Sequence, residues 1–483
     1  MKQNLNYDRK SAESIFAYST HLIGHSLHDF APDANGRNGK GALGQLVEEM
    51  YFEYEVNNDD RPDFHEAGLE LKCTPLKLSV QNEYLIKERL VCGMINYCKE
   101  CGVPFEQSHF YKKCLFMLIL FYLHQKGTSQ LDLQFLFALL WRIPEKDLII
   151  IRNDYNKIMS KIEAGLAHTL SEGDTMYLGA CRKGQSDENP MPQPHSAINA
   201  PRRAWSLKTS YMRTLLDYVK RSGKTAATNT EIIVPAVDEL VSFRQLKKES
   251  FDDILLKRIK LFRGKNCKEV FKKFEIPITR SKSKYSIAAN AIVSGATKSN
   301  VNLSEEFLKA GLVMKTIRVE IDGSIKESMS FENIDYQEVY DNENWTDSRL
   351  YEIFSNRFLF VIFRATGKKI LIPVAKKGKN KFEREDEYIL DDAFFWTMPQ
   401  DDLSIAQKYW EDIRKQVLAD NIRHGAFWTQ GLHKKFHVRP KALKSSDRHI
   451  SPVTGLPTAR KFCYWFNNEY VKEIIDRHNG KEI

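Results

Sequence analysis

The second half of this chain repeats the first half weakly but in the same order. Three pairs of segments carry the repeat: 64–75 with 307–318, 139–148 with 394–403, and more loosely 203–216 with 460–475. The offsets are 243, 255 and about 259 residues, which is far longer than the period of a solenoid. One such match could arise by chance, but three in order predict a domain that is duplicated in tandem.

The length of the chain also fits two domains. The sequence has 483 residues, of which 42% are hydrophobic and 28% charged, as in an ordinary folded protein. Residues 221–230 (RSGKTAATNT) are small or polar and contain no large apolar side chain. This stretch is typical of a linker. We therefore predict a first domain over 1–220, a linker over 221–240 and a second domain over 241–483.

The hydrophobic pattern indicates both helices and strands, and we predict an α/β fold with a mixed central sheet flanked by helices. Helices are expected within 1–30, 43–54, 148–164 and 207–219, and strands over 68–75 and 114–122. The longest apolar run, Cys114 to Leu123, has ten residues, well short of the roughly 20 that a membrane helix needs. It reads as a buried strand or a core helix.

Composition excludes several classes of protein. The net charge of +9 permits an anionic partner without proving one. No signal-peptide core is present at the N-terminus, and the eight cysteines are scattered, so we expect a reduced, cytoplasmic protein. Cys98 and Cys101 form one CxxC, for which a structural role is favoured over zinc binding. There is no GxxxxGK[ST] motif, so we expect no nucleotide-driven activity.

The clearest chemical signal is the segment from Asp63 to Lys72 (DFHEAGLELK). In a strand, Glu70 and Lys72 would lie on one face, with Leu69 and Leu71 on the other. Asp63, from the preceding turn, could then approach Glu70. Two carboxylates together favour a hard cation such as Mg²⁺, and a lysine beside it can orient water or stabilise charge on a phosphate. This is the D…ExK pattern of metal-dependent nucleases.

The pattern alone is weak, because a solvated strand with these common residues is the more frequent explanation. Glu48 strengthens it, since this carboxylate lies on a predicted helix just after the Gly-rich loop 36–44. Glu49 is the alternative in that helix.

Together, GKGALGQLVE (39–48) and DFHEAGLELK (63–72) resemble the MutH family of DNA endonucleases. The resemblance is closer to the two-domain type II restriction enzymes of that family that cut at GATC, and it covers nearly the whole chain. It implies a restriction-endonuclease-like core, with Asp63 and Glu70 as Mg²⁺ ligands and Lys72 as the catalytic lysine. It further implies that Glu48 is an additional acidic residue and Lys113, or its neighbour Lys112, a further lysine of the active site.

The resemblance also indicates residues that would contact DNA. These are Lys40, Arg182, Lys183, Gly184 and Lys208. Basic side chains in a major-groove loop can read guanine, although a phosphate contact without sequence information is the alternative. The family carries an Arg-Pro-Lys pattern here, whereas this chain has Cys-Arg-Lys at 181–183, which leaves open which side chain reads the base.

The second half lacks the predicted chemistry. At an offset of 243 residues, Val313 stands in place of Glu70, while Lys315 matches Lys72. Arg439 and Lys441 nevertheless keep the Arg-Pro-Lys pattern. We predict that this half binds DNA, and acts on the catalytic half, without cutting. A purely structural basic face is the alternative.

The sequence thus predicts a type II site-specific deoxyribonuclease that hydrolyses double-stranded DNA with Mg²⁺. The alternatives are a mismatch-repair-type nickase and a DNA-binding regulator without hydrolysis. A single catalytic centre cuts one strand per engagement, so a double-strand break requires re-engagement or a DNA-induced dimer.

Overall fold

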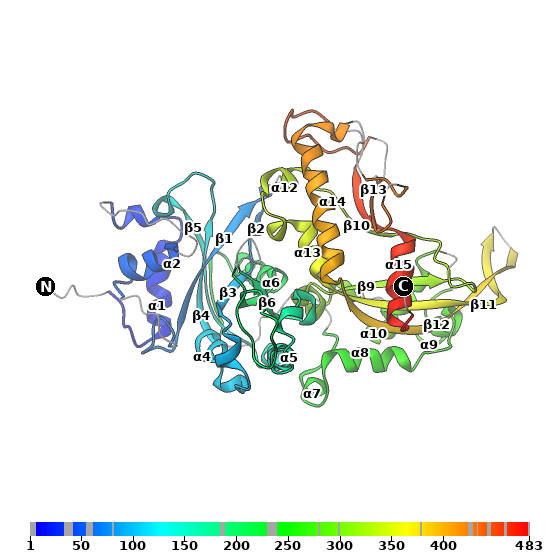
Figure 1. Ribbon diagram of the computed structural model, residues 1–483, viewed down its shortest axis with the longest axis horizontal. Coiled ribbons are helices and arrows are strands. Elements are labelled where there is room, and N and C mark those ends of the chain that lie inside the picture. Colours follow the sequence, from blue (N-terminus) through cyan, green and yellow to red (C-terminus); the bar gives the residue numbers. More distant parts are fainter. Residues whose placement is uncertain are drawn as a thin grey trace. The chain divides into compact units, whose positions relative to one another are not determined.

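The computed structural model divides into two compact units. Unit 1 comprises Met1–Ser250 and Glu305–Gly311, and unit 2 comprises Phe251–Ser304 and Leu312–Ile483 (Figure 1). The structure describes residues 6–32, 42–54, 61–79, 82–183, 189–228, 239–278, 281–297, 300–376, 379–423, 428–431, 433–441, 446–457 and 461–481. No helix of these residues is both long enough and apolar enough to cross a membrane.

Unit 1 is built on a mixed five-stranded sheet in the order β2-β1-β4-β5-β8. Its strands are β1 (Glu70–Leu78), β2 (Tyr84–Ile86), β4 (Phe116–Leu123), β5 (Phe135–Arg142) and β8 (Thr225–Thr228). β1 and β4 are parallel, and β4 and β5 are antiparallel. The apolar run predicted as a strand or core helix therefore forms the buried strand β4, while Cys114 ends the preceding helix.

A second, three-stranded sheet of unit 1 has the order β3-β7-β6. It consists of β3 (Leu90–Met94), β6 (Leu178–Arg182) and β7 (Arg203–Leu207). The helices of this unit are α1 (Ala12–Ser19), α2 (Ala42–Leu46), α3 (Tyr97–Glu100), α4 (His109–Cys114), α5 (Glu145–Glu163), α6 (Thr209–Arg221), α7 (Phe243–Leu246) and α11 (Glu305–Ala310). A π-helical segment, η3 (Val47–Tyr51), continues α2. The predicted mixed sheet with helices is therefore present.

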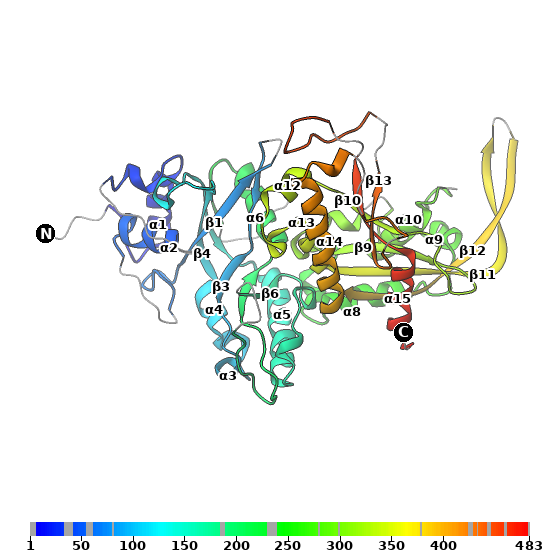
Figure 2. The ribbon, with the colours of Figure 1, turned by 45° about the horizontal axis from the view of Figure 1, so that its top comes forward.

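Unit 2 also contains two sheets, in the orders β12-β11-β9 and β10-β14-β13. The strands are β9 (Val313–Val319), β10 (Met329–Asn333), β11 (Arg357–Lys376), β12 (Lys379–Thr397), β13 (Phe436–Pro440) and β14 (Phe462–Phe466). The helices are α8 (Phe251–Lys260), α9 (Cys267–Lys273), α10 (Lys284–Ser294), α12 (Tyr336–Asp341), α13 (Arg349–Ser355), α14 (Gln400–Leu418) and α15 (Asn468–His478). β9 pairs only with the first part of β11, so the distal part of the β11–β12 hairpin extends beyond the sheet (Figure 2).

The two units share a strand topology. β1 is parallel to β4, which is antiparallel to β5, and β9 is parallel to β11, which is antiparallel to β12. After β5 and β12 the chain passes through Pro144 and Pro399, which are the N-caps of α5 and α14. The segment β7–α6 recurs as β14–α15. The second and third sequence echoes thus fall on corresponding elements of the two units, whereas of the first echo only the strand part does, because residues 307–311 belong to unit 1.

A buried hydrogen bond recurs at corresponding positions. In unit 1 the Tyr211 hydroxyl donates to Asp147 at 2.6 Å, and in unit 2 the Tyr470 hydroxyl donates to Asp402 at 2.7 Å. In unit 1 the bond joins α6 to α5, and in unit 2 it joins α15 to α14. Sequence reasoning missed both pairs, although the offsets of 255 and 259 residues relate them.

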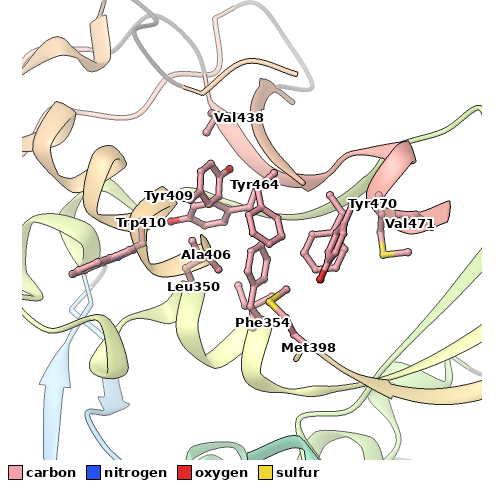
Figure 3. Close-up of a cluster of buried hydrophobic side chains, with 14 of the residues drawn as sticks. Leu350, Phe354, Met398, Ala406, Tyr409, Trp410, Val438, Tyr464, Tyr470 and Val471 are labelled. Carbon is pink, nitrogen blue, oxygen red and sulfur yellow. The ribbon is translucent and has the colours of Figure 1, made fainter. Parts of the chain in front are cut away.

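The core of unit 2 is rich in aromatic side chains (Figure 3). Tyr409 and Trp410 of α14, Phe354 of α13, Tyr464 of β14 and Tyr470 of α15 are all buried there. The Tyr409 hydroxyl donates to the main-chain oxygen of residue 437 at 2.8 Å, so its polar atom is satisfied inside the core. This packing joins α14 and α15 to the sheet β10-β14-β13.

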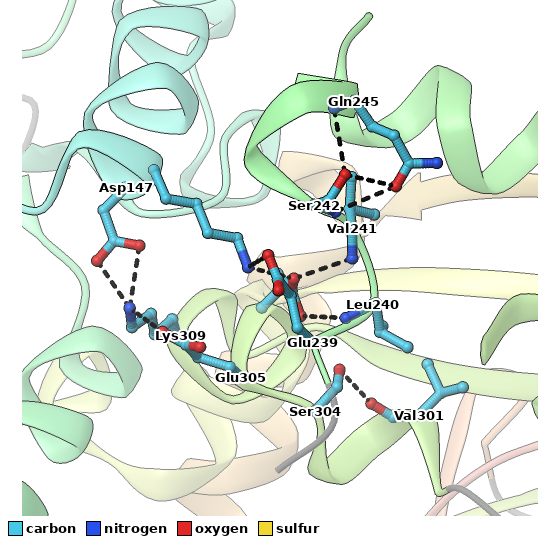
Figure 4. A network of polar contacts seen from close by, with 12 residues as sticks. Asp147, Glu239, Leu240, Val241, Ser242, Gln245, Val301, Ser304, Glu305 and Lys309 are labelled. Carbon is cyan, nitrogen blue, oxygen red and sulfur yellow. Dashed lines mark hydrogen bonds and ion pairs between the residues drawn. The ribbon is translucent and has the colours of Figure 1, made fainter. Parts of the chain in front are cut away.

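Helix α11 belongs to unit 1 although unit 2 residues flank it in sequence. Lys309 bonds both carboxylate oxygens of Asp147, at 2.9 and 2.7 Å (Figure 4). Glu306 is fully buried, accepts from Lys146 at 2.9 Å, and also accepts from the main-chain N–H groups of Leu240 and Val241. These charges are buried in pairs, as burial in a low dielectric requires.

The predicted linker is ordered in part. Thr225–Thr228 form strand β8, whose partner is β5, because the small side chains of this stretch are compatible with a sheet edge. Residues 229–238 lie outside the described part of the chain. The compact units meet in sequence at Ser250 and Phe251, later than the predicted end of the linker at 240.

Candidate functional site

Strand β1 places the central acidic and basic side chains of the site. Glu70 and Lys72 alternate with Leu69 and Leu71, which are 0% and 4% exposed in the core of unit 1. The alternation of a strand therefore sends the two charged side chains to the opposite face. Glu70 is itself only 1% exposed, so this carboxylate must be compensated.

Asp63 reaches Glu70 from the turn before β1. The main-chain N–H of Leu71 donates to Asp63 Oδ2 at 2.9 Å, and the main-chain N–H of Asp63 donates to Glu70 Oε2 at 3.2 Å. This reciprocal pair of bonds holds the two carboxylates side by side. Burial, together with the charge of Glu70, raises the pKa of Asp63.

Two lysines balance these carboxylates. Lys72 Nζ lies 2.5 Å from Glu70 Oε1, and Lys113 Nζ, at the end of α4, lies 3.7 Å from Glu70 and 3.9 Å from Asp63. Burial disfavours the charged form of Lys72, but the charge of Glu70 outweighs it and raises the pKa of the ammonium group. The structure thus brings Lys113 into the site, as the resemblance implied.

Glu48 completes the group from the π-helical segment η3, where it is 9% exposed. Burial, with smaller contributions from Asp63 and Glu70, raises the pKa of Glu48 to about 8. At neutral pH this side chain therefore keeps its proton, unless a cation offsets the neighbouring negative charges.

The described side chains set a limit on metal binding. Within that part of the chain, no group of three or more His, Cys, Asp or Glu side chains is placed to hold a metal ion. Asp63 and Glu70 offer two carboxylates, and Mg²⁺ often takes only one or two from a protein and retains water for the rest. The raised pKa of Asp63 reflects a repulsion that a cation would relieve. The donor set therefore fits an Mg²⁺ ion held by two side chains.

Comparison with known proteins places this cluster in a recognised domain. A family model described as DNA mismatch repair enzyme MutH matches residues 52–154, which include Asp63, Glu70, Lys72 and Lys113. The chain contains a MutH-family domain. It is also 27% identical, over 512 aligned positions, to the type II restriction enzyme Sau3AI of Staphylococcus aureus. That alignment covers 96% of this chain and 98% of the relative.

The residues predicted to contact DNA differ in their exposure to solvent. Arg182 is exposed at the end of β6, and Lys183 follows it. Lys208 is buried, and its ammonium group donates to the main-chain oxygen of Thr175 at 2.5 Å. This burial and this hydrogen bond argue against the predicted DNA contact of Lys208. Lys40 and Gly184 lie outside the described residues.

Unit 2 contains the equivalent of strand β1 without the acidic residues of the MutH-family site. Val313 and Lys315 begin β9, beside β11, just as Glu70 and Lys72 begin β1, beside β4. Glu306, which matches Asp63 by offset, is instead part of unit 1, where it pairs with Lys146. Lys315 has thus lost both carboxylates that accompany Lys72.

The basic end of β13 corresponds to the end of β6. Arg439 lies opposite Cys463 and Cys181 lies opposite Ala204, so Arg-Pro-Lys at 439–441 matches Cys-Arg-Lys at 181–183. Arg439 and Lys441 are exposed and lie over the ring of Trp465, at 5.6 and 5.8 Å. Lys441 also donates to the Ser330 hydroxyl at 2.9 Å, a contact for which we find no signal in the sequence.

All eight cysteines are described, and all are free thiols. Cys98 is exposed and Cys101 is partly exposed.

Proposed function

We propose that this chain is an Mg²⁺-dependent DNA endonuclease of the type II restriction class, cutting double-stranded DNA at a short site, GATC. One observation carries the proposal: Asp63, Glu70, Lys72 and Lys113 converge within the segment that matches MutH. The similarity to a type II restriction enzyme over nearly the full length supports the restriction class. GATC rests on the resemblance of the motifs.

Asp63 and Glu70 would hold the Mg²⁺ ion. When bound, the ion would stabilise negative charge on the scissile phosphate and make a bound water more acidic. The protein holds both carboxylates in place before any ion arrives, through the main-chain N–H groups of Leu71 and Asp63. This preorganisation lowers the cost of assembling the site.

The two lysines have distinct positions. Lys72 lies on the same face of β1 as Glu70 and keeps some exposure to solvent, so its ammonium group can orient water or contact a phosphate oxygen. Lys113 comes from α4 and lies at similar distances from both carboxylates. It balances the site electrostatically, and Glu48 adds a carboxyl group that exchanges a proton near neutral pH.

We further propose that unit 2 is a duplicated, non-cleaving copy that binds a second DNA site and acts allosterically on unit 1. The shared strand topology, the recurring Tyr–Asp bond and the Arg-Pro-Lys end of β13 support this proposal. Val313 in place of Glu70 removes the means to hold the metal. A ligand that binds one state of the protein better shifts the population toward that state.

A second candidate is a strand-nicking endonuclease, because the matched family model is a mismatch repair enzyme. A nickase would convert supercoiled plasmid only to the open circle, whereas a restriction enzyme would also make linear DNA. Mapping the ends of the linear product would then define the site and the cut positions.

The test is cleavage of a plasmid of known sequence by the full chain, with and without Mg²⁺. Glu70→Ala should abolish cleavage while retaining DNA binding in EDTA, because the basic contacts are unchanged. The control is Glu106→Ala, which breaks an exposed ion pair with Arg152 in the same unit and should leave cleavage unaltered. Cleavage by Glu70→Ala at the wild-type rate would show that the assigned site is wrong.

A further inference from the structure

Unit 2 has a cavity of about 340 Å³ beside the strand that corresponds to β1. This lies at the small end of the roughly 300–1,000 Å³ range of ligand pockets. Lys315 of β9 and Ser330 of β10 are among the lining residues. The cavity is thus built on the counterpart of the catalytic strand.

Most charged side chains of the cavity are already paired. Arg318 pairs with Glu327 at 2.7 Å, and Lys326 pairs with Glu320 at 3.1 Å. Lys315 differs, because no carboxylate of the described residues forms an ion pair with it. Its ammonium group donates to the main-chain oxygen of Ser330 at 2.8 Å and lies over the ring of Phe331.

A second ammonium group approaches the same serine. Lys441 donates to the Ser330 hydroxyl at 2.9 Å, so two cationic side chains meet at one residue. The nearby Glu332 is held by Arg349, at 3.0 and 2.6 Å. Burial and the charge of Lys441 lower the pKa of Lys315 to about 8, although Cys463 and Glu332 act in the opposite direction. An anion between the two ammonium groups would offset their mutual repulsion and favour the charged form of Lys315.

We infer that a phosphate group binds at the Ser330 end of this cavity, through Lys315 and the Ser330 hydroxyl, which line it, and through Lys441, which contacts that hydroxyl. In unit 1 the lysine of the ExK strand is paired with a carboxylate that can hold a cation. In unit 2 Val313 stands in place of that carboxylate while the lysine remains. The corresponding position therefore favours an anionic ligand instead of a cation. Lysine binds phosphate as a point charge, and the hydroxyl adds a hydrogen bond.

The phosphate has two sources, a phosphodiester of bound DNA or free phosphate. The DNA source rests on the proposed function, whereas the phosphate site itself does not. In either case binding holds Lys315 in its charged form, so it is accompanied by proton uptake near pH 8.

The first arm of the test is calorimetric titration of the full chain with inorganic phosphate at pH 8 in EDTA. Lys315→Met removes the charge, and Val313→Glu places a carboxylate on the same strand face as Lys315. Both should weaken phosphate binding at least about tenfold, which is about 1.4 kcal/mol. Lys326→Met is the matched control, because Lys326 lines the same cavity but is paired, and it should bind like the wild type.

The second arm measures duplex DNA binding in EDTA as a function of salt. If the phosphate belongs to DNA, Lys315→Met should reduce the slope of log K against log [salt] by about 1. An unchanged slope with lost phosphate binding identifies free phosphate as the source. Phosphate binding that is absent in the wild type, or equal in the wild type and in Lys315→Met, overturns the inference. Phosphate binding that depends on Lys315 in a chain that does not cut DNA would refute the proposed function alone.

Discussion

Lys315→Met should stabilise unit 2 at neutral pH, since it removes a partly buried ammonium group that lacks an ion-pair partner among the described residues. The pKa of Lys315 is lowered from 10.5 to about 8 in the folded protein. Below pH 8 the folded state must carry a charge that it disfavours, so stability is lowest there. As pH rises from 8 to 10.5, the unfolded chain binds more protons than the folded one, and stability increases.

The size of this effect follows from the shift. At about 1.4 kcal/mol per pK unit, the full shift corresponds to about 3 kcal/mol. Because the side chain keeps some exposure to solvent, we expect about 1–2 kcal/mol at pH 7. At pH 10 wild-type Lys315 is largely deprotonated when folded, and the advantage of the methionine should fall to about a half of its value at pH 7 or less.

The assay is urea unfolding of the full chain at pH 7 and pH 10 in phosphate-free buffer. Tryptophan fluorescence reports mainly on unit 2, which holds five of the seven tryptophans. Lys326→Met is again the control and should change little. A variant less stable than the wild type at pH 7, or a difference that is equal at both pH values, would refute the reasoning.

Three further predictions follow from the same contacts. Lys72→Ala should lose most cleavage activity without a large loss of Mg²⁺ affinity, measured by metal titration, because Lys72 serves the water or the phosphate; an equal loss of affinity would make it a structural partner of the carboxylates. DNA with two targets should be cut faster than DNA with one, and replacing Arg439 and Lys441 together with Ala should remove this stimulation and leave basal cutting; equal rates per site at low enzyme concentration would contradict the allosteric role. Tyr470→Phe should destabilise unit 2 by about 1–3 kcal/mol in urea unfolding, since Asp402 loses a buried hydrogen bond; no change would mean that another donor takes its place.

The local arrangement of the candidate site could be predicted from the sequence, because it depends on neighbours in the chain. The period of two in a strand places Glu70 and Lys72 on one face and the leucines in the core. Asp63 is only a turn away, so its approach to Glu70 is also local. The echoes also pointed to strands that share the same order and direction in the two units, β1 with β9 and β5 with β12.

Contacts between distant segments were decided only by the tertiary structure. Lys208 is a basic residue of the type that contacts DNA, but in the folded chain it is buried and donates to the main-chain oxygen of Thr175. Glu306 aligns with Asp63, yet α11 packs into unit 1, where Glu306 meets Lys146. No local pattern encodes such partners, since they depend on which surfaces the packed sheets and helices bring together.

The contacts that Lys315 and Lys441 make with Ser330 were also decided only by the tertiary structure. The sequence determined that Val313 replaces a carboxylate and that a lysine remains on β9. Whether another acidic side chain from elsewhere would neutralise that lysine could not be read from the chain, because any of the 63 acidic residues could have supplied one. Only the packing of β10 and β13 against β9 decided that Lys315 donates to the main-chain oxygen of Ser330, and that Lys441 donates to the hydroxyl of the same serine.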